Sequence, residues 1–202
     1  MAASNTSVHS TADVADSAQI AAGAKVWHYA QVRENAVLGE NVIVGRGAYV
    51  GTGVQVGDNC KIQNYALVYE PAVLERGVFI GPAVVLTNDH FPRAINADGS
   101  IKSADDWHPV GVTIREGASI GASATCVAPI TIGRWALVGS GSVVVKDVPD
   151  FALVVGSPAR RIGWVGTAGH PLTQDATGDW VCPTTGARYR ETGPDQLIEV
   201  TA

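Results

Sequence analysis

An aliphatic residue occupies every sixth position from Val8 to Leu86 without interruption. A small or β-branched residue stands two positions before each of them, and glycine directly follows several. A period of six fits neither the 3.6-residue period of an amphipathic helix nor the alternation of a long strand. It predicts a short strand followed by a corner, repeated along the chain. The fourteen aliphatic positions are Val8, Val14, Ile20, Val26, Val32, Leu38, Val44, Val50, Val56, Ile62, Val68, Leu74, Ile80 and Leu86.

Three such units would close one triangular coil of eighteen residues, so the pattern predicts a prism-shaped solenoid of the all-β class. Large aliphatic residues would point into the prism, small residues would fill the crowded corners, and glycine would serve where the backbone turns sharply. Residues eighteen apart would then stack at one strand spacing, about 4.8 Å. Val26, Val44, Ile62 and Ile80 are expected to form one internal ladder of this kind.

The rhythm breaks after Leu86, and residues 87–107 contain turn-forming residues without a six-residue period. This segment is predicted to be a loop that leaves the prism. We expect His108 to occupy the unit that closes the interrupted coil, so that the loop adds sixteen residues to a prism of about seven coils. The ladder then resumes, and Pro149 ends it. The resumed positions are Ile114, Ile120, Cys126, Ile132, Val138 and Val144.

Two segments follow from this division: a β-helix over residues 1–149 with the loop 87–107, and a C-terminal extension over residues 150–202. The extension is expected to pack on the prism or on a neighbouring subunit. The stretches DWVCP and ARYRE within it are predicted to pair as a hairpin. The Cys-Pro-x-x-Gly sequence at Cys182 is half of a zinc-ribbon pattern, but one cysteine cannot supply four ligands, so no metal is expected.

Composition narrows the function classes. The formal net charge of −5 argues against nucleic acid as a partner, because such a surface needs a basic patch. Cys60, Cys126 and Cys182 are far apart in the chain and are expected to be buried thiols in a reducing compartment. The opening residues lack an apolar signal region, and no stretch is long enough to span a membrane. A cytoplasmic protein is expected.

Several local motifs carry a resemblance to a known family. The hexapeptide repeat, followed by VGSGSVVVKDVP (138–149) and VVGSPARRIGWVG (154–166), resembles the left-handed parallel β-helix acyltransferases that use acyl-coenzyme A. The left hand comes from this resemblance, because it opposes the usual crossover rule. KVWHYAQV (25–32), KIQNYALVYE (61–70) and LTNDHFPRA (86–94) are similar to the N-acetyltransferases of nucleotide-linked 3-amino sugars.

The resemblance implies a homotrimer with active sites between adjacent prisms, acetyl-CoA lying along the coils, and a UDP- or dTDP-linked amino sugar as acceptor. The resemblance also implies three groups of site residues within this sequence. The catalytic candidates are Asn88, His28 and Glu70. The substrate-binding candidates are Asn64, Tyr69, His90 and Arg93. The cofactor-binding candidates are Gly139, Ser140, Lys146, Arg160 and Arg161.

Spacing alone places some of these residues on two edges of the prism. His28 and Asn64 belong to one stack of residues eighteen apart, and Glu70 and Asn88 belong to another. One prism cannot easily close both edges around a ligand, whereas two prisms side by side can. The reaction itself, attack of an amine on a thioester, needs a neutral amine, an aligned carbonyl and a donor for the developing oxyanion.

Other interpretations stay open. Asn88 beside Asp89 also fits turn chemistry at the start of a loop. His90 fits either an acid-base pair with Asp89 or a solvent-facing loop. His28 fits packing between subunits. Arg160 and Arg161 fit solvated charges, and Arg93 fits either a uronate carboxylate or phosphates.

Other function classes compete with sugar N-acetylation. O-acetylation and transfer of a longer acyl group use the same fold. A γ-type carbonic anhydrase shares the prism but needs three histidines converging on zinc, a spacing that the five histidines here lack. A non-catalytic β-helix would show a flat, regular outer face, and the outward positions here are irregular.

Overall fold

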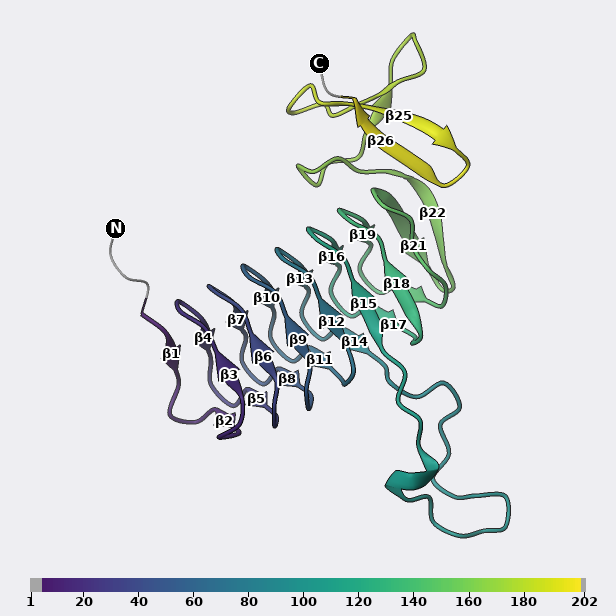
Figure 1. Ribbon diagram of the computed structural model, residues 1–202. Coiled ribbons are helices and arrows are strands. Elements are labelled where there is room, and N and C mark those ends of the chain that lie inside the picture. Colours follow the sequence, from purple (N-terminus) through teal and green to yellow (C-terminus); the bar gives the residue numbers. More distant parts are fainter. Residues whose placement is uncertain (1–4, 201–202) are drawn as a thin grey trace.

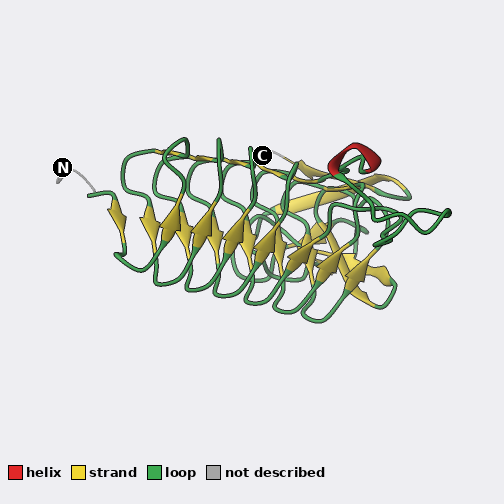
Figure 2. Cartoon of the chain, turned by 90° about the horizontal axis from the view of Figure 1, so that it is seen from below, coloured by secondary structure: helices red, strands yellow, loops and turns green. Residues whose placement is uncertain are grey.

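The computed structural model describes residues 5–200, which form a long triangular prism of short strands with a small antiparallel sheet at its C-terminal end (Figure 1). The coils follow one another along a single axis (Figure 2). Nearly all regular structure within residues 5–200 is strand, and the one helix in this range is the 3₁₀ turn η1 (Ala104–Asp106) in the loop. The outer ends of the two predicted segments, residues 1–4 and 201–202, lie outside the described residues.

Three sheets form the faces of the prism, here called A, B and C. Face A contains β1 (Ser7–Val8), β4 (Lys25–Val26), β7 (Ile43–Val44), β10 (Lys61–Ile62), β13 (Phe79–Ile80), β16 (Ser119–Ile120), β19 (Leu137–Val138), β21 (Ala152–Gly156) and β22 (Ala159–Trp164). Face B contains β2 (Asp13–Val14), β5 (Gln31–Val32), β8 (Tyr49–Val50), β11 (Leu67–Val68), β14 (Val85–Leu86), β17 (Thr125–Cys126) and β20 (Val143–Val144). Face C contains β3 (Gln19–Ile20), β6 (Val37–Leu38), β9 (Gln55–Val56), β12 (Val73–Leu74), β15 (Val112–Ile114) and β18 (Ile130–Ile132).

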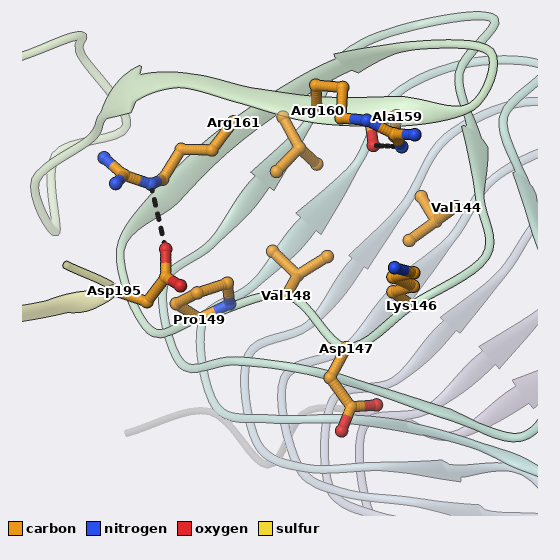
Figure 3. Close-up of a pocket in the computed structure, with 10 residues that line it drawn as sticks. Val144, Lys146, Asp147, Val148, Pro149, Ala159, Arg160, Arg161 and Asp195 are labelled. Carbon is orange, nitrogen blue, oxygen red and sulfur yellow. Dashed lines mark hydrogen bonds and ion pairs between the residues drawn. The ribbon is translucent and has the colours of Figure 1, made fainter.

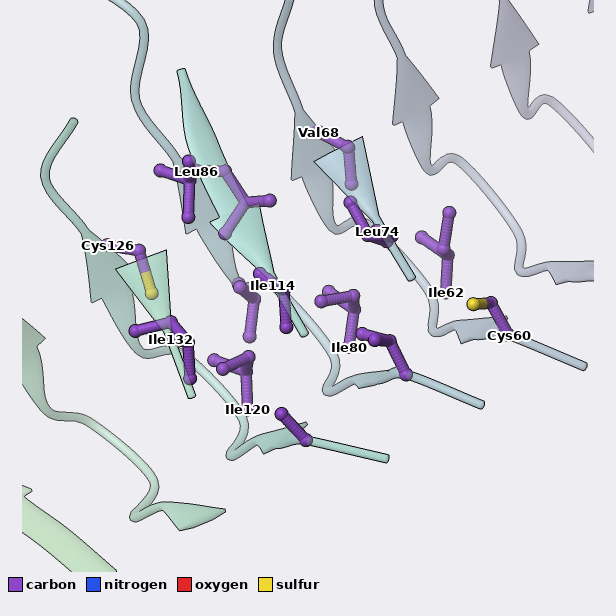
Figure 4. Close-up of a cluster of buried hydrophobic side chains, with 14 of the residues drawn as sticks. Cys60, Ile62, Val68, Leu74, Ile80, Leu86, Ile114, Ile120, Cys126 and Ile132 are labelled. Atoms are coloured by element: carbon purple, nitrogen blue, oxygen red, sulfur yellow. The ribbon is translucent and has the colours of Figure 1, made fainter. Parts of the chain in front are cut away.

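The predicted internal ladders are confirmed. Val26 pairs with Val44, Val44 with Ile62, and Ile62 with Ile80, all in parallel register. The second residue of each two-residue strand faces inward, and from the second coil onward these side chains are almost fully buried. Figure 4 shows the aliphatic side chains of successive coils stacked inside the prism. The all-β fold, the triangular coils and the single excursion loop agree with the expected parallel β-helix.

The prediction for His108 is wrong. Leu74 pairs with Ile114 and Leu86 pairs with Cys126, so β15 itself closes the fifth coil. The step from Leu86 to Ile114 is 28 residues instead of six, which makes the insertion 22 residues long rather than sixteen. His108 is exposed and precedes Pro109, which has no N–H to donate to a ladder. The predicted number of about seven coils is nevertheless correct, because Val148 forms a bridge with Ile132 and provides the third side of the seventh coil.

The C-terminal extension begins on the prism. β21 pairs in parallel with β19, with Val154 beside Val138, and thus starts an eighth coil before β22 turns back antiparallel to it. The expected hairpin is present, because β24 (Trp180–Val181) pairs with β25 (Arg188–Gly193). With β23 (Thr173–Gln174) and β26 (Gln196–Val200) these strands form a four-stranded sheet.

Buried aromatic side chains join this sheet to the prism. Trp164 and Tyr189 are 1% and 0% exposed, and the ring of Tyr189 lies 5.4 Å from that of Phe151 at the end of the prism. The Trp164 indole N–H donates to Glu191 on β25. Within residues 5–200 the three cysteines are free and buried, and burial raises the pKa of the Cys60 thiol to about 11 and that of Cys126 to about 12.

We expect Ile80→Ala to destabilise the protein by about 2–5 kcal/mol, because Ile80 is fully buried in the middle of the prism and its loss leaves a cavity. Val73→Ala is the matched control, since Val73 points outward from face C and is 38% exposed. Its effect should stay within about 0.5 kcal/mol. Urea unfolding at one protein concentration measures both. Equal losses would contradict the assignment of inside and outside.

The C-terminal sheet should lose stability in acid. Arg190 donates two hydrogen bonds to Asp179, at 2.8 and 2.9 Å, and lowers the pKa of that carboxyl. Hydrogen bonds from Thr177 and then Arg188 lower the pKa of Asp175. A depressed folded-state pKa stabilises the fold above the unfolded value, about 4, and this stabilisation fades as the pH falls further. Thermal unfolding of Asp179→Asn from about pH 6 to about pH 3 should therefore show a weaker pH dependence than the unsubstituted protein, and an identical dependence would refute the ion pair's role.

Candidate active site

The edge between faces B and C, here called the BC edge, carries Asn88 at the root of the loop. Asn88 comes directly after β14, and its carbonyl accepts a hydrogen bond from Val110 N at 3.1 Å, which closes the base of the loop. Thr87 Oγ1 accepts another from Ala128 N at 3.0 Å, in the coil above. Asn88 is half-buried. Its backbone is therefore held by the prism on one side and by the returning strand on the other.

Glu70 lies on the same edge, one coil below Asn88. Its carboxylate lies so close over Gly51 that a Cβ at residue 51 would collide with Oε2. This oxygen is buried and has no hydrogen-bond partner among residues 5–200. Buried polar atoms are normally paired, so an unpaired carboxylate oxygen marks a place where a ligand or a neighbouring chain can donate.

Tyr49 and Tyr69 flank this carboxylate. Their ring centroids are 5.1 Å apart. Burial, with the nearby Glu70 charge as the next cause, raises the pKa of Tyr49. Tyr69, expected to bind substrate, is thus placed beside Glu70 at the BC edge.

The edge between faces A and B, here called the AB edge, carries His28 and Asn64. Gly47 N donates to the His28 carbonyl at 3.0 Å, and Arg46 N donates to Asn64 Oδ1 at 2.9 Å, so the predicted eighteen-residue stack is present. The His28 ring stacks on His9 at 3.4 Å. Beside these residues a groove of about 260 Å³, here called the Trp27 groove, is lined by Trp27, His28, Ile43, Gly45, Arg46, Gln63 and Asn64.

Face B separates the two edges. Its outward residues Tyr49, Leu67 and Val85 stand in register in successive coils and form a half-buried, largely apolar strip. His28 and Asn64 therefore lie on a different edge from Glu70 and Asn88, as the spacing predicts. One chain brings together the members of each pair, but not the two pairs.

The loop places its two candidates near its root. His90 is exposed, and its ring nitrogen lies 3.3 Å from the Ala128 carbonyl while its ring meets Phe91 edge-on. Asp89 accepts a hydrogen bond from Phe91 N, which is the local turn chemistry that Asp favours. Arg93 is exposed and donates to the Pro92 carbonyl.

The three expected cations meet at the C-terminal end of the prism. Lys146, Arg160 and Arg161 line one pocket of about 280 Å³, together with Asp147 and Asp195 (Figure 3). Lys146 and Arg160 are exposed. They are the cations of this pocket that can serve an anionic ligand.

Arg161 is engaged in several contacts within the chain. It pairs with Asp195 at 3.4 Å and Glu191 at 3.7 Å, and its guanidinium lies 4.2 Å from the Trp164 ring centroid. It donates as well to the Pro194 carbonyl at 2.6 Å. These contacts tie β22 to the C-terminal sheet, so Arg161 is largely committed within the chain.

A second groove, of about 350 Å³, connects this pocket with the loop root. Gly111, Thr113, Pro129 and Thr131 line it, and Asp147 lines both cavities. Thr131 N donates to Asp147 Oδ1 at 2.7 Å. The sequence motifs do not single out Thr131 and Asp147. The signal that could have found them is their position on the coils directly above Asn88.

Gly139 and Ser140 do not join the cation pocket. They lie at the AB edge of the seventh coil, after β19, whereas Lys146 lies at the BC edge after β20. A Cβ at Gly139 would meet the Val155 side chain, so this glycine permits close packing of β21. Within residues 5–200 no three His, Cys, Asp or Glu side chains gather where they could hold a metal ion. No helix in the same range is long and apolar enough to cross a membrane.

Two segments of the chain match known families of hexapeptide-repeat proteins. Residues 17–52 match the family described as bacterial transferase hexapeptide (six repeats), and residues 110–146 match the hexapeptide repeat of succinyl-transferase. The fold is also shared with solved structures. A hexapeptide-repeat acetyltransferase from Vibrio cholerae, complexed with acetyl coenzyme A, has a TM-score of 0.52 at 22% identity and covers 65% of this chain and 72% of that one. A hexapeptide transferase family protein from Anaplasma phagocytophilum has a TM-score of 0.51 at 18% identity, with 81% of both chains covered.

Curated relatives match over shorter stretches. Serine acetyltransferase 4 of Arabidopsis thaliana is 36% identical over 122 residues, which is 59% of this chain and 33% of the relative. A dTDP-3-amino-3,6-dideoxy-alpha-D-galactopyranose 3-N-acetyltransferase of Aneurinibacillus thermoaerophilus is 54% identical over 52 residues, 26% of this chain and 27% of the relative. The matches therefore span about a third or less of these proteins. They confirm the resemblance to hexapeptide-repeat acyltransferases.

We expect Lys146→Ala combined with Arg160→Ala to weaken coenzyme A binding at least tenfold, because two exposed cations would no longer meet its phosphates. Calorimetric titration with coenzyme A measures this. Arg161→Ala is the matched control from the same pocket, and it should lower the thermal unfolding midpoint more than it weakens coenzyme binding. A double variant that binds coenzyme A normally would show that the coenzyme lies elsewhere.

Proposed function

We propose that this hexapeptide-repeat chain transfers the acetyl group of acetyl-CoA to the 3-amino group of a nucleotide-linked amino sugar, for polysaccharide or glycoconjugate precursors. The observation that carries the proposal is the pair of cavities joined at Asp147, which runs from the loop root to the cations. Gly111 lies at its lower end and directly follows Val110, whose N–H donates to the Asn88 carbonyl, and the unpaired Glu70 carboxylate lies one coil below Asn88. Lys146 and Arg160 lie at its upper end.

The length of this path suits the donor. Asn88 belongs to the fifth coil, Lys146 to the seventh, and Arg160 lies on β22 beside the eighth. Three strand spacings give about 14 Å along the axis. The phosphates would meet Lys146 and Arg160, the pantetheine amides would run past Thr131, and the thioester would arrive beside Asn88.

The reaction joins the amine nitrogen to the thioester carbonyl carbon and breaks the carbon–sulfur bond. The amine loses one proton, and the departing thiolate takes one up. A sugar amine is less basic than lysine and is partly neutral near pH 7, so alignment matters more than a strong base. The side-chain carbonyl of Asn88 would accept from the amine, and Glu70 would accept from the amine or a sugar hydroxyl.

A homotrimer would complete the site. The AB edge with His28 and Asn64 and the BC edge with Glu70 and Asn88 do not meet within one chain. The strip of Tyr49, Leu67 and Val85 between them offers apolar surface for a neighbouring prism. His90 and Arg93, on the exposed loop, would then reach the acceptor from the side.

The serine acetyltransferase relatives favour a second acceptor. The Escherichia coli (strain K12) enzyme is 40% identical over 88 residues, 43% of this chain and 31% of the relative. The matched stretch is longer than that of the dTDP-sugar enzyme. A small hydroxy amino acid would use the same donor path but would leave the Trp27 groove empty.

The proposal is tested by incubating the full chain with acetyl-CoA and, separately, UDP-linked and dTDP-linked 3-amino sugars, their 3-hydroxy analogues, and L-serine. Mass spectrometry detects the product, and thiol release gives the rate. Acetylation of an amino sugar with little of its hydroxy analogue is the expected result. Acetylation of L-serine alone would replace the proposal by its alternative.

Asn88→Ala should lower turnover about 10- to 1000-fold, the effect of losing an oriented hydrogen bond in the transition state. The fold should remain, because no core volume is lost. Asn88→Asp adds a charge that favours the protonated amine, so its activity should recover as the pH rises. Thr52→Ala, two coils below on the same edge, is the surface control. Unchanged turnover in Asn88→Ala would mean that Asn88 only forms the turn.

A further inference from the structure

Three large aromatic side chains on the AB edge are exposed. Trp27, Tyr29 and Tyr65 are 47%, 60% and 57% exposed. Tyr29 and Tyr65 also have left-handed backbone, with φ of 58° and 61°. A bulky residue in this conformation is disfavoured, and such strain concentrates at binding sites.

Other corners of the prism handle this conformation differently. Asn35, Asn41 and Asn59 occupy it on the other two edges, as expected for a residue that tolerates a positive φ. Phe151 also has a positive φ, but its ring packs on Tyr189. The Tyr29 and Tyr65 rings stay largely exposed instead, with Arg46 over the ring of Tyr29 and the ring of Tyr65 lying against Gly47.

The groups around Trp27 match the parts of a pyrimidine nucleotide. The Trp27 groove lies on one side of the indole, and a second groove of about 260 Å³, lined by Val8, His9 and Val26, lies on the other. An exposed indole offers a stacking surface for a base. The Gln63 and Asn64 side chains border the groove one coil above Arg46, where their amide groups can hydrogen-bond a hydroxyl of the sugar.

Arg46 supplies the charge that a diphosphate needs. Its guanidinium lies 5.2 Å from the centroid of the Tyr29 ring, which helps to orient it. Arg46 is exposed and lines the same groove. Tyr29 therefore contributes by holding the cation, and Trp27 by presenting a ring face.

The side chains around the Trp27 groove and at the loop root lie in successive coils of the prism. Trp27 lies in the second coil, Arg46 in the third, Asn64 in the fourth and Asn88 in the fifth. The span from Trp27 to Asn88 is therefore three strand spacings, about 14 Å along the axis. A nucleoside diphosphate sugar presents base, diphosphate and sugar in this same order.

We infer that the Trp27 groove binds the pyrimidine base and the diphosphate of the acceptor, so that the two substrates lie end to end along the prism axis. The acceptor occupies coils two to five and acetyl-CoA occupies coils five to eight. This inference rests on the proposed function, because it assigns the far end of the same acceptor. It predicts that the groove recognises the free nucleotide without the sugar.

Titration of the whole chain, residues 1–202, with UDP and with dTDP tests this. Trp27→Ala and Arg46→Ala should each weaken binding of both nucleotides about tenfold, since one removes a stacked base and the other a phosphate partner. Phe79→Ala is the matched control, because Phe79 is a 37% exposed aromatic on face A outside the groove. It should leave nucleotide binding unchanged. Acetyl-CoA binding should stay unchanged in all three variants.

The outcomes separate the inference from the function. Normal nucleotide binding by both groove variants overturns the inference, and so does an unsubstituted protein that binds acetyl-CoA but neither nucleotide. An unsubstituted protein that binds neither acetyl-CoA nor nucleotide contradicts the proposed function itself. Light scattering measures the oligomeric state of each variant. If Trp27→Ala changes that state, nucleotide binding by Arg46→Ala alone tests the inference.

Discussion

Parallel hydrogen bonding between successive coils governs the rest of this structure. Each two-residue strand pairs in register with the strand one coil further along, eighteen residues away except across the loop insertion and at the last coil, so every edge residue is held at a fixed height along the axis. The backbone of each corner is tied to the coil above or below, as Arg46 N is to Asn64 Oδ1. A side chain at an edge therefore has little freedom to choose its neighbours. Chemistry on this prism must be arranged as a one-dimensional sequence of groups.

That constraint explains the division of the candidate site. A substrate longer than one coil spacing must lie along an edge of the prism. The side chains that contact it then follow one another in chain order. Aromatic rings and Arg46 come first, then the carboxylate of Glu70 and the amide of Asn88, and then Lys146 and Arg160. The loop is the one long interruption of the coils among the described residues, and it leaves the prism beside Asn88. In the proposed trimer, the face between the edges, with Tyr49, Leu67 and Val85, would form the contact between prisms.

The fixed register between coils also determines which contacts can be predicted from the sequence. The ladder from Val26 to Ile80 and the two stacks with His28 and Glu70 follow from counting by eighteen, because the register admits no other pairing. His108 was misplaced because a hydrophobic period does not show which turn of an interrupted coil resumes the ladder. The ion pair of Arg161 with Asp195 joins segments without a common period, so no count could find it. Gly139 and Ser140 lie in the same coil as Lys146 but on another edge, a separation that the motif alone does not show.

Subunit complementation tests the central claim, a site shared between two prisms, most directly. One chain would carry His28→Ala with Arg46→Ala on the AB edge, and the other would carry Asn88→Ala on the BC edge. Each should be nearly inactive alone in acetyl transfer to the accepted nucleotide sugar. Mixed trimers, formed by co-expression and purified with two different tags, should regain activity, because some interfaces then combine two intact edges. Mixed trimers as inactive as either parent would contradict a shared site and would place the whole reaction on a single prism.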